Sequence, residues 1–257
     1  MAYSLRNNLF AGYNDSSNEN LKFLELSEKI VNFGVKSNVA IKPYLSTDLP
    51  LFSLLPHEKK KMILDMLHTK VIMLEAAERE GVSFRSNKQV LWHVIKSLGL
   101  TPCSDLCDVI DDEDVLEIHW LTDIVQLYHS FSFYEKSSYT LEELCSLPWE
   151  ELYDTDPQTF SNIHQLVDNL MTGKYRSTYD PKIPSYIVKE KRSAFLFEVA
   201  IEYRLTSPLF DKNGKAVATV SIERLNVIDR KIKDADEEAQ LLRQAPLSLA
   251  VPLHSLE

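Results

Sequence analysis

The segment from Ser193 to Arg224 constrains the fold of this 257-residue chain more than any other part of it. Apolar residues there fall on alternate positions: Phe195, Phe197, Val199, Ile201, Tyr203 and Leu205. A period of two predicts a long strand with one buried face. Asn213-Gly214, a pair preferred in tight hairpin turns, follows, and apolar residues alternate again from Ala216 to Ile222. We therefore predict a long antiparallel hairpin.

The residues before this hairpin show helical rather than strand spacing. Residues 20–130 are predicted to be a helical region, with helices at about 21–33, 56–80, 87–98 and 112–129. Gly81 and Gly99 stand where helix C-caps are expected, and Val39–Tyr44 is a candidate edge strand. The later segments 140–146 and 157–172 are also predicted helices, the first with a Thr140/Glu143 capping box. The expected fold class is α+β.

The two ends of the chain differ from its middle. Residues 1–19 are polar and are expected to be a flexible N-terminus. The charged tail 229–257 is expected to be helical or disordered. Apolar residues from Ile228 to Leu242 have a spacing that fits either a short coiled coil or an amphipathic helix packed on the body. No signal peptide or membrane span is evident, so we expect a cytoplasmic location.

Composition and motifs argue against several classes of function. Lys and Arg total 28 against 38 Asp and Glu, a net charge of −10, which makes nucleic acid an unlikely partner. Cys103, Cys107 and Cys145 are too few for a disulfide framework, and no metal-ligand spacing accompanies them. The acidic run 111–114 lacks the pattern of a calcium loop and is interpreted as a solvated helix start. No nucleophile elbow or phosphate-binding glycine loop is present, so we do not predict an enzyme.

Four segments together resemble the PAS domain, a small α+β sensor fold. Residues 137–144 are similar to the family's Gly-Tyr-Ser-x-Glu-Glu-Leu stretch, and 148–152 to the stretch that follows it. Residues 157–173 resemble the family's long connecting helix, and 207–215 its final hairpin turn, Pro-x-x-Asp-x-x-Gly. The resemblance spans residues 131–228. We find no strand pattern before Tyr139 for the family's first two strands.

The resemblance implies a regulatory protein that binds a small ligand or a protein partner through this domain, with no enzymatic output domain of its own. It also implies a possible homodimer, through the PAS-like domain or the C-terminal helix. The ligand and any cofactor are unknown, and no metal is predicted. Candidate ligand-binding residues are aromatic or imidazole side chains: His129, Phe133, Tyr139, Trp149, Phe195, Phe197 and Tyr203. The same aromatic residues could equally fill an ordinary core.

Three other functions stay open. The helices at 56–99 carry eight Lys and Arg residues from Lys59 to Lys96, which would suit a DNA-binding transcriptional regulator. A small enzyme with unrecognised chemistry would need polar groups that converge in a pocket, and spacing alone reveals none. A structural or virulence-type interaction protein is the remaining alternative.

Overall fold

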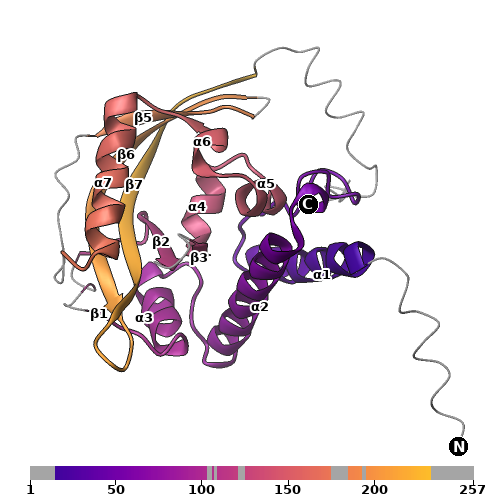
Figure 1. Ribbon diagram of the computed structural model, residues 1–257, viewed down its shortest axis with the longest axis horizontal. Coiled ribbons are helices and arrows are strands. Elements are labelled where there is room, and N and C mark those ends of the chain that lie inside the picture. Colours follow the sequence, from indigo (N-terminus) through magenta and orange to yellow (C-terminus); the bar gives the residue numbers. More distant parts are fainter. Residues whose placement is uncertain are drawn as a thin grey trace, which may run out of the picture.

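The computed structural model describes residues 15–102, 106, 109–120, 125–174, 185–192 and 195–232. N-terminal helices are followed by a curled antiparallel sheet with further helices beside it, so the α+β class is confirmed (Figure 1). One hydrophobic core runs through both parts, from Phe23 in the first helix to Leu225 in the last strand.

Three long helices make up the N-terminal part: α1 (Asp15–Lys36), α2 (His57–Arg79) and α3 (Asn87–Ser97), with a short 3-10 helix η1 (Phe52–Leu54) before α2. The three predicted helices are confirmed, although α1 begins earlier and ends later than expected. It continues through Gly34, where an added Cβ would lie 2.8 Å from Ile41 side-chain atoms. A glycine inside the helix therefore lets the following loop pack closely. The described loop at Val39–Tyr44 contains no strand, contrary to the prediction.

The sheet is built around one long hairpin. Its strands are β1 (Thr101–Pro102), β2 (Val115–Trp120), β3 (Val125–His129), β4 (Tyr153–Asp154), β5 (Tyr186–Glu190), β6 (Phe195–Phe210) and β7 (Ala216–Ile232). They run in the order β3-β2-β7-β6-β5-β4, with β1 paired to β6. The predicted hairpin is confirmed as β6 and β7. Its turn is held by the Asp211 carboxylate, which accepts hydrogen bonds from the backbone N–H of Asn213 and Lys215, and by Gly214 at φ 74°.

The helix predicted for about 112–129 is wrong, because this segment forms β2 and β3. Leu116 and Ile118 lie on one face of β2 in the core, while Glu117 and His119 lie on the opposite face and are also largely covered. With both faces covered, the strand lacks the alternation of buried and exposed residues that marks a half-buried strand. The expected boundary at residue 130 therefore lies inside the sheet.

Four helices lie between β3 and β5: α4 (Phe131–Lys136), α5 (Leu141–Ser146), α6 (Trp149–Leu152) and α7 (Pro157–Met171). The capping box is confirmed, because Thr140 Oγ1 accepts from Glu143 N and the Glu143 carboxylate accepts from Thr140 N. In Figure 1, α7 lies along the long strands β6 and β7, whereas α4, α5 and α6 lie between the sheet and the N-terminal helices.

The N-terminal part is hydrogen-bonded directly to α5. Leu141 N donates to Lys42 O at 2.7 Å and Glu142 N donates to Pro43 O at 3.1 Å. The buried Glu142 carboxylate accepts in return from Leu51 N and Phe52 N, at 2.9 and 3.1 Å. The loop between α1 and α2 and the first turn of α5 are thus one connected unit.

The acidic run 111–114 is not a solvated helix start. Asp114 is fully buried, and its two carboxylate oxygens bind Arg204 at 2.6 Å and Arg224 at 3.0 Å. Asp111 is paired with the same two arginines. Four charges therefore fasten this loop to β6 and β7.

Several predictions fall partly or wholly outside the described residues. The flexible N-terminus was expected over 1–19, but α1 begins at Asp15, and residues 1–14 are not described. The tail expected from 229 begins as strand, since β7 runs to Ile232, and residues 233–257 are not described. Cys103 and Cys107 are also outside the described residues, whereas Cys145 on α5 is a free thiol.

Candidate ligand-binding cavity

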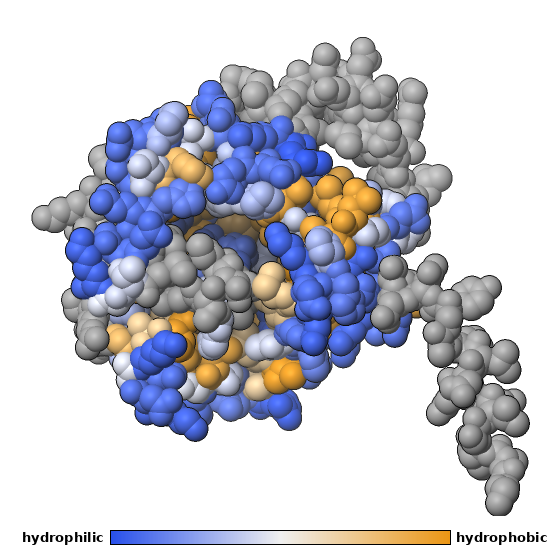
Figure 2. Space-filling view, viewed as in Figure 1, coloured by the Kyte–Doolittle hydropathy of each residue, from blue (hydrophilic) through white to orange (hydrophobic). Residues whose placement is uncertain are grey.

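A cavity of about 500 Å³ lies between one face of the sheet and the helices α2, α4, α5, α6 and α7. Its size is typical of small-molecule sites in proteins. Figure 2 shows this face of the molecule hollowed between the strands and the helical part, with hydrophobic and hydrophilic residues both at the edge of the hollow. Aliphatic and aromatic side chains from the helices form much of the cavity wall.

The sheet supplies a row of polar side chains to the cavity. Paired positions run across four strands, from Thr206 on β6 to Ser221 on β7, then to Glu117 on β2 and His129 on β3. Residues that pair across an antiparallel sheet share a face, and all four line the cavity. We call these four residues the polar row. Thr206 Oγ1 is buried and lies near the Tyr203 hydroxyl, but it makes no hydrogen bond of normal geometry among the described residues.

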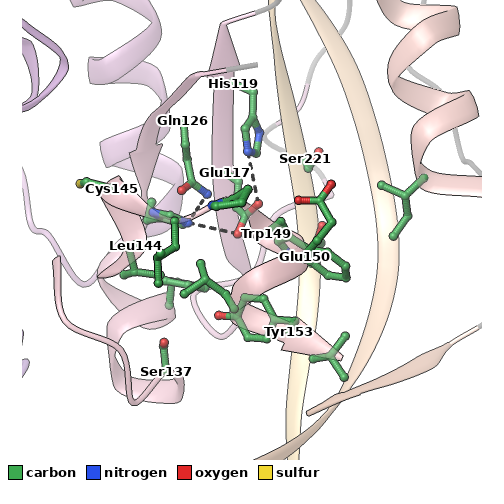
Figure 3. Close-up of a pocket in the computed structure, with 18 of the residues that line it drawn as sticks. Glu117, His119, Gln126, Ser137, Leu144, Cys145, Trp149, Glu150, Tyr153 and Ser221 are labelled. Atoms are coloured by element: carbon green, nitrogen blue, oxygen red, sulfur yellow. Dashed lines mark hydrogen bonds and ion pairs between the residues drawn. The ribbon is translucent and has the colours of Figure 1, made fainter. Parts of the chain in front are cut away.

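Glu117 is the centre of this row. Its carboxylate oxygens lie 3.3 Å from His129 Nε2 and 3.8 Å from His119 Nε2. The amide nitrogen of Gln126 also contacts His129 Nε2, and the His129 ring stacks on Phe133 with centroids 4.0 Å apart. Figure 3 shows Glu117, His119 and Gln126 close together, with Trp149 of α6 and Tyr153 of β4 on the helical side.

Burial decides the charge of these groups. It lowers the pKa of His129 to about 4 and also lowers the pKa of His119, so both imidazoles are neutral at neutral pH. Burial opposes the ionisation of Glu117, but the hydrogen bond from His129 and the interaction with both imidazoles outweigh it, so the Glu117 pKa lies below its ordinary value. Glu117 is therefore a carboxylate that accepts a hydrogen bond from neutral His129 and lies near neutral His119, and neither imidazole cancels its negative charge.

Glu223, two residues after Ser221 on the same face of β7, has the opposite character. Burial and the nearby Glu117 charge raise its pKa well above the ordinary value, more than the Tyr203 hydroxyl lowers it. This shift favours the protonated form of Glu223, which can donate a hydrogen bond. The neighbouring Tyr203 hydroxyl lies 3.1 Å from Ser221 Oγ. The cavity thus holds two carboxyl groups whose pKa values are moved in opposite directions by their surroundings.

Lys70 of α2 brings a buried cation to another part of the wall. Its Nζ donates to the Tyr134 hydroxyl at 2.5 Å and lies 5.5 and 4.9 Å from the ring centres of Tyr128 and Tyr134. Burial lowers the Lys70 pKa to about 8. The amine is still mainly protonated at neutral pH.

Four of the seven predicted site residues line the cavity: His129, Phe133, Trp149 and Tyr203. Tyr139 does not. It is buried elsewhere, where its hydroxyl donates to Leu152 O and accepts from Arg192 N. Phe195 and Phe197 belong to β6, but their side chains lie outside the described residues.

The sequence reasoning missed the charged and polar members of the site, namely Lys70, Glu117, His119, Gln126, Ser221 and Glu223. Lys70 falls in the helices predicted to carry a basic surface. Glu117 falls in the segment that was wrongly predicted to be a helix. Ser221 and Glu223 do alternate with Val220 and Ile222, which is the one available signal, but this pattern is equally typical of an exposed strand face.

Comparison of the chain with protein-family models and with curated proteins finds no match. Among the described residues, no cluster of three or more His, Cys, Asp or Glu side chains is arranged to hold a metal ion. In the same part of the chain, none of the helices combines the length and the apolar character needed to span a membrane.

Proposed function

We propose that this protein is a cytoplasmic sensor in which a PAS-like domain holds a small ligand in the cavity and regulates a partner protein. Two strands, β2 and β3, precede Tyr139, where the resemblance requires strands. The long helix α7 and the terminal hairpin of β6 and β7 occupy the segments on which the resemblance was based. These features support a PAS-like arrangement of residues 115–228.

The observation that carries the proposal is the polar row inside an otherwise largely apolar cavity. Buried polar groups cost free energy unless they are paired. Here Glu117 and Glu223 face the same space as Thr206, whose Oγ1 makes no hydrogen bond of normal geometry among the described residues. A core built only for stability would place apolar side chains at these positions. A ligand that offers complementary hydrogen-bonding groups gives them partners.

The basic helix surface gives less support to the DNA-binding alternative. Lys60 and Lys70 are buried, and Arg85 is held by Ser37 O, Asn38 O and the Glu135 carboxylate. These three cations are therefore buried or bonded within the protein rather than presented to phosphates at its surface. A homodimer remains compatible with the proposed sensor and would be seen in the same experiment.

The first test is native mass spectrometry of the full chain as purified, followed by thermal shift against a panel of small metabolites. We expect bound extra mass, or stabilisation by at least one class of compound. Ser221→Leu places a larger side chain in the cavity and should remove binding. Asn226→Leu on the exposed part of the same strand is the matched control and should leave binding intact. If Ser221→Leu folds and still binds as the wild type does, the cavity is not the ligand site.

A second candidate function, an acid–base enzyme, is favoured by one observation. Glu117 and Glu223 are neighbouring carboxyl groups with pKa values moved in opposite directions, the pattern expected of a catalytic base and acid. The two candidates are separated by recovering any bound compound after long incubation with the protein. An unchanged compound supports a sensor, whereas conversion that is lost in Glu117→Gln supports an enzyme.

A further inference from the structure

We propose that the ligand carries a single carboxylate and that Lys70 and Tyr134 bind it. This inference deepens the proposed function and rests on it, because it assigns a chemical class to the occupant of the same cavity. It concerns the wall formed by α2 and α4, and both residues line the cavity.

Lys70 is a buried cation that lacks a counter-charge. No carboxylate lies within ion-pair distance of its Nζ among the described residues, and its one hydrogen-bond partner there is the Tyr134 hydroxyl. The other buried lysine of the same helix, Lys60, shows the usual solution, since its Nζ lies 3.7 Å from the Glu19 carboxylate. A buried ammonium without an anion is costly, and an anionic ligand would remove that cost.

The unused hydrogen-bond donors of Lys70 and Tyr134 would suit a ligand group that accepts hydrogen bonds. An ammonium group has three protons, and Tyr134 accepts one of them. The O–H of Tyr134 has no acceptor among the described residues, because the one hydrogen bond made there by its hydroxyl is the bond that it accepts from Lys70. Two adjacent groups therefore have unused donors. A carboxylate can accept from both, with one oxygen on each.

The neighbouring groups limit the ligand further. The His129 ring, centred 5.9 Å from the Tyr134 ring, is neutral and adds no positive charge. Beyond it, Glu117 carries a negative charge that would repel a second acidic group. One ammonium and one phenol suit a monoanion better than a phosphate, which usually takes more donors. The inferred ligand is thus a monocarboxylic acid with a mainly apolar body, and a polar group placed near Glu117 would have to be a hydrogen-bond donor.

The test compares acids with their own neutral amides. Decanoate and 4-phenylbutyrate are titrated into the full chain by calorimetry, beside decanamide and 4-phenylbutyramide. We expect each acid to bind about 10- to 100-fold more tightly than its amide, the range of a charge-assisted hydrogen bond. Lys70→Met should abolish this preference and Tyr134→Phe should reduce it. Lys61→Met, an exposed lysine on the same helix, should leave it unchanged.

A second measurement reports on Lys70 itself. Because a bound carboxylate favours the charged amine, binding at pH 8.5 should be accompanied by proton uptake, visible as a dependence of the binding heat on the buffer. This uptake should vanish in Lys70→Met. Equal binding of acids and amides would overturn the carboxylate proposal and leave the cavity function standing. If neither acids nor amides bind, and no other compound does, the proposed function fails as well.

Discussion

Replacing Lys70 with methionine should make the ligand-free protein more stable. Methionine has nearly the same length as lysine without the charge. In the folded protein the Lys70 pKa falls from 10.5 to about 8. Each pKa unit corresponds to about 1.4 kcal/mol, so holding the ammonium in this wall costs the folded state about 3 kcal/mol at neutral pH. The lost hydrogen bond to Tyr134 offsets about 1 kcal/mol of the gain.

The net expectation is a stabilisation of about 2 kcal/mol at pH 7.5, measured by urea unfolding of the full chain. Most substitutions of buried residues have the opposite sign. Lys61→Met is the control and should change the free energy of unfolding by less than about 0.5 kcal/mol, because Lys61 is exposed.

The pH dependence of this difference is the stricter test. Above pH 10.5 the amine is neutral in both states and the cost disappears. As the pH falls from 10.5 to 8, the unfolded chain takes up a proton that the folded protein resists, so the cost grows to its full value and then stays constant. The difference in free energy of unfolding between Lys70→Met and the wild type should therefore shrink by about 1 kcal/mol per pH unit from pH 8.5 to 9.5. A destabilised variant, or a difference that is independent of pH, would refute the reasoning.

Three further outcomes are expected from unfolding measurements. The free energy of unfolding of Glu223→Gln should rise relative to that of the wild type as the pH rises above 4.5, because the raised pKa of folded Glu223 opposes the ionisation that the unfolded chain undergoes; a difference that does not change with pH would contradict this assignment. Asp114→Ala should lower the free energy of unfolding by about 3 kcal/mol, because Arg204 and Arg224 lose their buried partner. An unchanged urea midpoint would show that these ion pairs contribute nothing to stability. Thr140→Ala should cost about 1 kcal/mol through loss of the capping box, and Glu143→Ala should cost less.

The sequence predicted secondary structure correctly where the pattern that marks an element lies within the element itself. The apolar spacing of α2, the capping box at Thr140 and the alternation in β6 and β7 each depend on residues that are close in sequence. The helix prediction for the segment of β2 and β3 was wrong. The β2 face that carries Glu117 lies against the cavity, and the helices that form the other cavity walls are distant from β2 in sequence.

The candidate site was less predictable than the fold. Aromatic residues could be nominated by type, and His129, Phe133, Trp149 and Tyr203 do meet at the cavity. The charged groups could not, because Lys70, Glu117 and Glu223 are brought together only by the register of β2 against β7 and by the packing of α2 over β3. The shifted pKa values of Lys70 and Glu223 follow from burial, which no spacing rule in the sequence reports.

The hydrogen bonds between α5 and the loop that joins α1 to α2 bear on how such a sensor would transmit its state. Leu141 lines the cavity, and its backbone N–H is bonded to Lys42 O, while Glu142 holds the backbone at Leu51 and Phe52. A ligand that displaces α5 must therefore also move this loop. Leu45 and Leu54 of the loop are exposed to solvent. The N-terminal helices are then no separable effector reached through a linker. In the proposed sensor these helices would move together with the binding pocket, and the loop at 42–54 would be the surface at which a partner detects that movement.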